Sequence, residues 1–110
     1  MEKPLKGDVV VVPFPFSDLS QAKRRPALVL ASLAGDDLIP CQITSRAVTD
    51  ENAVPIENGD FASGGLRVSS SIRPNRLFTA DRRIVLDVAG RLRASVLENA
   101  VLKVIAILRS

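Results

Sequence analysis

The apolar residues of this chain come in short runs that Pro and Gly interrupt, and the pattern changes only near the end. Residues 8–14 are dense in β-branched residues, which is typical of a β-strand, and the apolar run at residues 25–30 indicates a second strand. The Gly and Pro between such runs indicate turns. From residue 95 onward, apolar residues recur every three or four positions, as in an amphipathic helix. The sequence therefore predicts a mainly β fold, a small barrel or strongly bent sheet, with a C-terminal α-helix packed on it.

The expected strands cover residues 8–14, 25–30, 38–44, 53–56 and 66–72, and residues 84–88 fit either a strand or a short helix. Pro13 and Pro15 cannot donate a backbone hydrogen bond, so the first strand should end at a sheet edge or outside the sheet. Ser95 followed by Glu98 fits a capping box, which places the start of the helix near residue 95. The length of 110 residues suits a single domain, residues 1–110.

The residue types that are missing exclude several kinds of chemistry. There is no His, so imidazole acid–base catalysis is excluded. Cys41 is the only Cys, which excludes an internal disulfide and, without His, a structural zinc site. We expect Cys41 to be a small buried residue rather than a nucleophile, because no His is present to activate it. With no Trp or Tyr and four Phe, a nucleic-acid site built mainly on base stacking is not expected.

The charges are unevenly distributed along the chain. The formal net charge is only +3, from 15 basic and 12 acidic residues, which favours an anionic partner weakly. Three cations are consecutive at residues 23–25, and the second half holds further Arg residues at positions 73, 76, 82, 83, 91 and 93. These clusters fit either an anion-binding surface or a solvated surface that keeps the protein soluble. Asp36 and Asp37 follow Gly35, and we interpret them as a turn rather than a metal site.

Features of the sequence also bear on where the protein works. No apolar run reaches the length of a transmembrane helix, because Pro13 ends the longest early run, Val9 to Val12. The first residues carry charge but no apolar stretch before a cleavage site, so we expect no secretory signal. Together with a single Cys, this pattern predicts a protein of the reducing cytoplasm.

Two segments are more distinctive than the rest of the chain. Residues 6–19 contain a Gly-Asp pair before an apolar strand and a polar loop, and residues 25–30 read Arg-Pro-Ala-Leu-Val-Leu. Residues 42–45 then read Gln-Ile-Thr-Ser, residues 75–79 read Asn-Arg-Leu-Phe-Thr, and Gly-Arg-Leu at 90–92 precedes the terminal helix. In these motifs the chain resembles the MazF/PemK family, the toxins of bacterial type II toxin–antitoxin systems.

The resemblance implies a fold, an activity and partners. The fold would be a small SH3-like β-barrel with a C-terminal helix, the MazF/CcdB-like toxin fold, assembled as a homodimer. The activity would be that of an mRNA interferase, an endoribonuclease that needs neither metal nor cofactor. It would cleave single-stranded mRNA at short specific sequences and thereby arrest growth. The partner would be a cognate antitoxin whose disordered tail folds onto the toxin and covers the RNA site.

The family motifs carry over to individual residues of this chain. Arg25 matches the catalytic arginine, and Thr44 matches the catalytic threonine at the end of the third strand. A guanidinium suits this chemistry because its planar fork binds two phosphate oxygens at once. Ser45 would assist Thr44 as a second hydroxyl at the substrate. Lys23 and Arg24 would bind substrate by attracting the RNA backbone.

One part of the family pattern is altered. Several relatives carry an Arg-x-Asp pair on the strand before the arginine that corresponds to Arg76, whereas residues 71–73 here read Ser-Ile-Arg. A cation, Arg73, stands where the carboxylate would be, and it fits either substrate phosphate binding or an ordinary surface role. Metal-free RNA cleavage usually begins when the 2′-hydroxyl of RNA attacks the adjacent phosphate. The sequence leaves open which group deprotonates that hydroxyl. Asp18, in the loop after the first strand, fits an ordinary turn better than base recognition.

Two alternative functions stay open on the sequence. The first is a toxin of the same fold that binds DNA gyrase and cleaves nothing, as CcdB-type relatives do. Those relatives rely on a Trp near the end of the helix, and this chain has no Trp. The second is a catalytically dead module that binds RNA or an antitoxin, which the altered residues 71–73 keep open.

Overall fold

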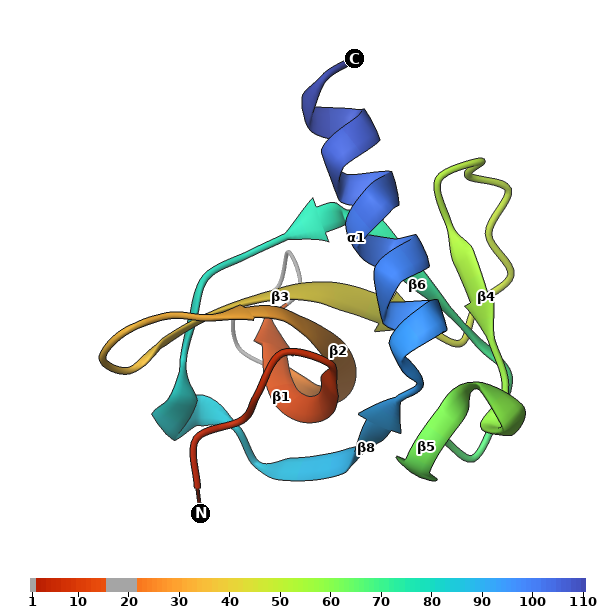
Figure 1. Ribbon diagram of the computed structural model, residues 1–110. Coiled ribbons are helices and arrows are strands. Elements are labelled where there is room, and N and C mark those ends of the chain that lie inside the picture. The colour runs from red at the N-terminus through yellow and green to blue at the C-terminus, as the bar shows by residue number, and fades with distance from the viewer. Residues whose placement is uncertain (1, 16–21) are drawn as a thin grey trace.

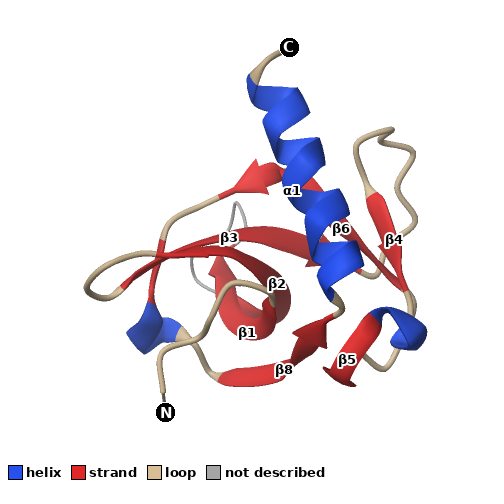
Figure 2. Ribbon diagram, viewed as in Figure 1, coloured by secondary structure: helices blue, strands red, loops and turns tan. Residues whose placement is uncertain are grey.

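A computed structural model describes residues 2–15 and 22–110. It confirms a mainly β fold with one C-terminal helix. Figures 1 and 2 show a curled antiparallel sheet with the helix lying against it. The elements are β1 (Asp8–Pro15), β2 (Ala22–Ser32), β3 (Asp37–Thr44), β4 (Val54–Ile56), the 3-10 turn η1 (Asn58–Asp60), β5 (Phe61–Gly64), β6 (Ser70–Leu77), β7 (Ala80–Asp81), the 3-10 turn η2 (Arg82–Ile84), β8 (Asp87–Leu92) and α1 (Ala94–Leu108).

The strands form one sheet in the order β4-β6-β3-β2-β1-β8-β5, and β7 pairs with β3. All pairings between the described strands are antiparallel, and most of them contain a register shift that bends the strands. Such bends let the sheet curl until it resembles part of a barrel (Figure 2). The order places β2 and β3 at the centre of the sheet, with β1 and β6 on their outer sides.

The sheet buries apolar side chains on both faces. One core contains Val9, Leu28, Cys41, Ile43, Ile56, Phe61, Ile72, Leu92 and Ala100, and the helix residues Val96 and Leu97 pack against it. The other core contains Val10, Val12, Ala27, Val29, Leu38 and Val85, with Phe14 and Phe78 packed against it. Neighbouring residues of β1 therefore serve different cores, because side chains alternate between the two faces of a strand.

Most of the expected strands are confirmed, and the prolines lie where their chemistry allows. β8 pairs with residues 8–11 of β1 only, so Pro13 and Pro15 lie where β1 has a single neighbour. The expected strand at residues 66–72 is displaced, because β6 begins at Ser70 and continues to Leu77. Alternation of apolar and polar residues was compatible with both positions, and pairing with β3 and β4 selects the later one.

The capping box expected at Ser95 is wrong. The helix begins at Ala94 with Arg93 as its N-cap residue, and no side chain caps it. Instead, the Arg93 guanidinium Nε donates to the carbonyl of Gly59 at 2.8 Å, and the Arg93 carbonyl accepts from the amides of Val96 and Leu97. The contact with η1 thus fixes where the helix begins. Of the described helices, none is long and apolar enough to cross a membrane.

Two glycines with positive φ provide a matched test of how tightly β5 and β8 approach each other. A Cβ on Gly64 (φ +65°) would lie 2.2 Å from the Ala89 carbonyl oxygen, whereas a Cβ on Gly35 (φ +76°) would meet no atom within 4 Å. Gly35→Ala should lower the free energy of unfolding by about 1 kcal/mol through backbone strain. Gly64→Ala should lower it by a further ~1–3 kcal/mol through the clash. The measurement is urea denaturation of both variants. Equal losses of unfolding free energy in the two would contradict the close approach of Gly64 to Ala89.

Candidate functional site

The candidate site is built on the ends of two central strands. In the antiparallel register of β2 and β3 the last pair is Ala27↔Gln42. Arg25 and Thr44 each lie two residues beyond that pair, so they occupy the same end and the same face of neighbouring strands. Both side chains are partly exposed. The structure thus brings together the two residues that the sequence singled out as catalytic.

The Thr44 hydroxyl is held in place by the chain that follows it. Its oxygen accepts a hydrogen bond from the backbone N–H of Arg46 at 3.2 Å, which closes a turn at the end of β3. Because the oxygen is the acceptor here, the hydroxyl keeps its own proton for donation to a ligand. On the other side of Thr44, strand β6 places Ser71 directly across from it.

The three consecutive cations do not point the same way. In the register with β1, Lys23 lies across from Phe14 and Arg25 lies across from Val12, whereas Arg24 lies across from Pro13. Strand alternation therefore places Lys23 and Arg25 on one face of β2 and Arg24 on the opposite face. Of these three residues, only Lys23 and Arg25 share a face with Thr44.

Arg73 brings a further cation to the same face. Ser71 pairs with Thr44, and Arg73 follows two positions later on β6, so the two side chains of β6 share that face. Nη2 of Arg73 contacts Oδ2 of Asp50 at 3.5 Å, and the two side chains are only 19% and 20% exposed. The other ion pairs among the described residues each include a side chain at least 43% exposed. The Arg73–Asp50 pair is therefore the one most shielded from solvent.

Asp50 is itself fixed by the loop between β3 and β4. Its Oδ1 accepts from the N–H of Asn52 at 2.9 Å, and its carbonyl accepts from the N–H of Ala53 at 3.1 Å. The Asn52 N–H, and after it the Arg73 guanidinium, hold the pKa of the Asp50 carboxyl below its ordinary value. Sequence reasoning missed Asp50, because nothing in residues 47–51 distinguishes this carboxylate from an ordinary loop residue.

Two buried polar atoms in and next to the Arg73–Asp50 ion pair lack a hydrogen-bond partner within the described part of the chain. They are Oε1 of Gln42 and Nε of Arg73. Gln42 lies two residues before Thr44 on β3, so it belongs to the same face. An unsatisfied donor and an unsatisfied acceptor raise the free energy of the folded state, and they mark this face as one where a bound ligand could be accommodated.

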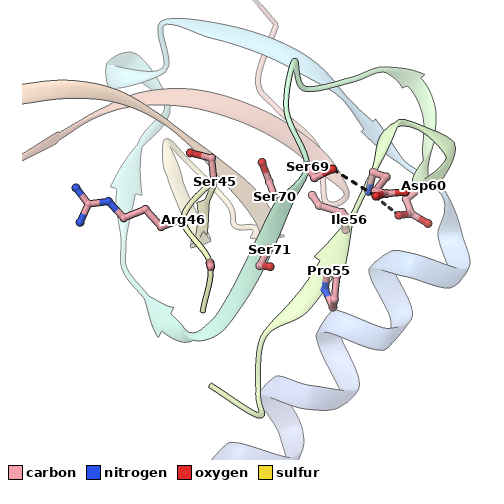
Figure 3. A pocket seen from close by; sticks show the side chains of 10 residues that line it. Ser45, Arg46, Pro55, Ile56, Asp60, Ser69, Ser70 and Ser71 are labelled. Carbon is pink, nitrogen blue, oxygen red and sulfur yellow. Dashed lines mark hydrogen bonds between the residues drawn. The ribbon is translucent and has the colours of Figure 1, made fainter. Parts of the chain in front are cut away.

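A polar hollow of about 480 Å³ opens immediately beyond Thr44 (Figure 3). Figure 3 shows Ser45, Ser70 and Ser71 bordering it, while the Arg46 side chain extends away from them. Ser70 and Ser71 are neighbours on β6 and therefore lie on opposite faces of the strand, and the Ser70 hydroxyl donates to the carbonyl of Val68 at 3.0 Å. Glu57 at the far wall accepts from the Ser69 hydroxyl at 3.3 Å. The lining consists of Ser45, Arg46, Ala47, Pro55, Ile56, Glu57, Asp60, Ser69, Ser70 and Ser71. Hydroxyls and carboxylates at this spacing suit a ligand that carries many hydrogen-bonding groups.

An aromatic pair lies beside Lys23 on the same face. The rings of Phe14 and Phe78 meet edge to face with their centroids 5.2 Å apart, and Phe14 is paired with Lys23 across β1 and β2.

Within residues 2–15 and 22–110, no three His, Cys, Asp or Glu side chains gather in a way that could hold a metal ion. Gly35 and Asp36 form the expected turn. Asp18 lies outside the described residues, so its interpretation as a turn residue stays a prediction.

Comparisons with known proteins agree with this architecture. Residues 5–108 match the family described as PemK-like, MazF-like toxin of type II toxin-antitoxin system. The crystal structure of MazF from Deinococcus radiodurans is similar, with a TM-score of 0.79 and 26% sequence identity over 100% of both chains. A MazE-MazF crystal structure from the same organism has a TM-score of 0.79 and 25% identity over 98% of both chains. A comparison with curated proteins gives no match.

An endoribonuclease from Mycobacterial species shares the fold as well, with a TM-score of 0.75 and 16% identity, over 99% of this chain and 94% of that one. The family match covers nearly the whole chain, and the fold agrees with that of MazF toxins. The chain belongs to the PemK-like, MazF-like toxin family of type II toxin–antitoxin systems.

Cys41 is buried, as the sequence predicted, and burial raises the pKa of its thiol to about 12. At about pH 8 only roughly one thiol in 10,000 would then be the reactive thiolate. We expect Cys41 in the native protein to resist a disulfide reagent such as dithionitrobenzoate and to react at once in guanidinium chloride. Rapid labelling of the folded protein would contradict the observed burial.

Proposed function

We propose that this toxin is a metal-independent endoribonuclease whose active face combines Arg25 and Thr44. The observation that carries the proposal is their location at the same end and on the same face of β2 and β3. Endoribonuclease and MazF structures share the fold, which supports the same class of activity here. The proposed substrate is single-stranded mRNA, cleaved at short specific sequences in the cytoplasm.

The proposed reaction transfers two protons and uses no metal ion. The 2′-hydroxyl oxygen of RNA attacks the adjacent phosphorus and loses its proton, and the bond from phosphorus to the 5′-oxygen breaks. The leaving oxygen takes up a proton, so the products are a 2′,3′-cyclic phosphate and a 5′-hydroxyl. Arg25 would bind two phosphate oxygens and stabilise their developing charge, and the Thr44 hydroxyl would donate a hydrogen bond to a non-bridging oxygen.

The remaining predicted residues take supporting roles in this proposal. Lys23, on the same face, and Arg24, on the opposite one, would attract the RNA backbone at longer range. Ser45 would contact the nucleotide that enters the polar hollow beyond Thr44. Arg73 would bind the scissile phosphate from the neighbouring strand.

We propose two protein partners as well. Complexes of MazF with MazE among the similar structures support a cognate antitoxin for this chain. A homodimer would give the apolar residues of α1 a place to pack: Leu102, Ile105 and Leu108 are exposed there, and the C-terminal half of the helix extends beyond the sheet (Figure 1).

In the direct test, the purified protein is incubated with a long single-stranded transcript and an excess of chelator. We expect cleavage at discrete sites, because no step of the proposed reaction uses a metal ion. The downstream fragments should accept radiolabelled phosphate from polynucleotide kinase without prior phosphatase treatment, which identifies 5′-hydroxyl ends. Intact RNA would refute the proposal and favour the gyrase-binding or the catalytically dead alternative.

The role of Arg25 can be tested against its neighbour. Arg25→Ala should lower the cleavage rate by at least about 100-fold, because it removes the proposed stabilisation of the transition-state charge. Arg24→Ala removes the same charge from the opposite face and should change the rate only a few-fold, through weaker attraction of RNA at low salt. The measurement is single-turnover cleavage at a mapped site, with circular dichroism to verify folding. Similar rates for the two variants would refute the assignment of Arg25.

A further inference from the structure

The Asp50–Arg73 ion pair lies beside the proposed active face and is the most shielded of the ion pairs between described residues. The mechanism above leaves Asp50 without a role. The two residues are 23 positions apart in the chain and meet only because the loop between β3 and β4 folds back over β6. Within the described residues, the Arg73 guanidinium donates to Asp50 through Nη2, and its buried Nε has no partner. The direction in which this guanidinium points therefore depends on Asp50.

The sheet register brings Arg73 within reach of the phosphate proposed to bind Arg25 and Thr44. Thr44 pairs with Ser71 and Ile43 pairs with Ile72, so Arg73 lies diagonally across from Thr44. Adjacent strands are ~4.8 Å apart, which separates β2 from β6 by about 10 Å across β3. Arginine side chains from both strands can therefore meet over Thr44, as a pair of cations around one phosphate.

Two cations on one partly buried face repel each other when no anion is bound. A carboxylate beside one of them offsets this repulsion and at the same time fixes its orientation. Asp50 can do both, because its own carboxylate is anchored through Oδ1 by the N–H of Asn52 while Oδ2 contacts Arg73. The loop thus provides a rigid support for the guanidinium.

We propose that Asp50 is a positioning residue that aims the Arg73 guanidinium at the RNA phosphate held by Arg25 and Thr44. The inference rests on the proposed ribonuclease function and extends it to a loop residue that the sequence motifs do not include.

A positioning role fits Asp50 better than a role as general base. Both of its carboxylate oxygens are engaged, one by a backbone N–H and the other by a guanidinium. These contacts also keep its pKa low, and a carboxylate of low basicity accepts a proton from a 2′-hydroxyl poorly. Asp50 therefore acts through Arg73 and does not receive the proton itself.

The test uses Asp50→Asn, which keeps the shape of the side chain and an oxygen for the Asn52 N–H but loses the charge. Asp36→Asn is the matched control, because Asp36 pairs with Arg82 at 3.0 Å near the opposite end of β3. We expect D50N to lower the single-turnover cleavage rate at a mapped site by about 10-fold to 100-fold, the effect of a misplaced catalytic contact. The D36N protein should cleave at the wild-type rate.

Two further measurements separate positioning from other roles. In an Arg73→Ala background, D50N should cause no additional loss, because the group that it orients is already absent. The acid limb of the pH–rate profile should be the same in D50N and wild type, because Asp50 is not the base. An additional loss in the R73A background, or a missing acid limb in D50N, would overturn the inference.

The outcomes distinguish this inference from the function on which it rests. If the wild-type protein releases no cyclic-phosphate ends, the proposed function fails and the role of Asp50 fails with it. If the wild type cleaves, R25A is inactive and D50N cleaves like D36N, only the role of Asp50 is refuted. Should D50N not fold, Asp50→Glu replaces it with the same expected and contrary results, since the extra methylene displaces the guanidinium without removing the charge.

Discussion

The pairing of β2 with β1 on one side and β3 on the other is the constraint on which the rest of the structure depends. Because side chains alternate along a strand, this register decides at once which residues enter each core and which cations share a face. A slip of one residue in β2 would move Leu28 out of the core that the helix covers, and it would exchange the positions of Arg24 and Arg25. The same hydrogen bonds therefore stabilise the fold and decide which arginine shares a face with Thr44.

The proposed active face begins where the second core ends. Ala27 and Val29 of β2 are buried in the second core, and Arg25 lies on the same face two residues before Ala27. On the neighbouring strand β3, the polar residues Gln42 and Thr44 lie on this face too. Charges at the border of a core are less screened than charges on an open surface, so their interactions with a phosphate are stronger. This placement also explains why the Arg73–Asp50 pair is more shielded than the other ion pairs of the described residues.

Sequence reasoning identified most of the strands, the helix, the buried Cys41 and the two residues at the centre of the proposed site. It succeeded where the signal was local, as in the β-branched run of β1 and the apolar periodicity of α1. It failed at residues 66–72, where pairing partners set the position of the strand. The helix starts close to residue 95 as expected, but the capping box that predicted this start is absent, and Arg93 contacts Gly59 instead. Asp50 could not have been found, because its significance comes from a contact with a residue on another strand.

The sequence by itself determined the fold class, the turn positions, the absence of imidazole chemistry and the residue types available to bind a phosphate. These properties follow from the conformational preferences and the chemistry of single residues and their near neighbours. Only the tertiary structure decided that Arg24 and Arg25 lie on opposite faces, that Ser71 lies across from Thr44, and that Asp50 meets Arg73. The physical reason is that contacts between strands depend on register and on sheet curvature, which arise from the packing of the whole chain and are not encoded in any one segment.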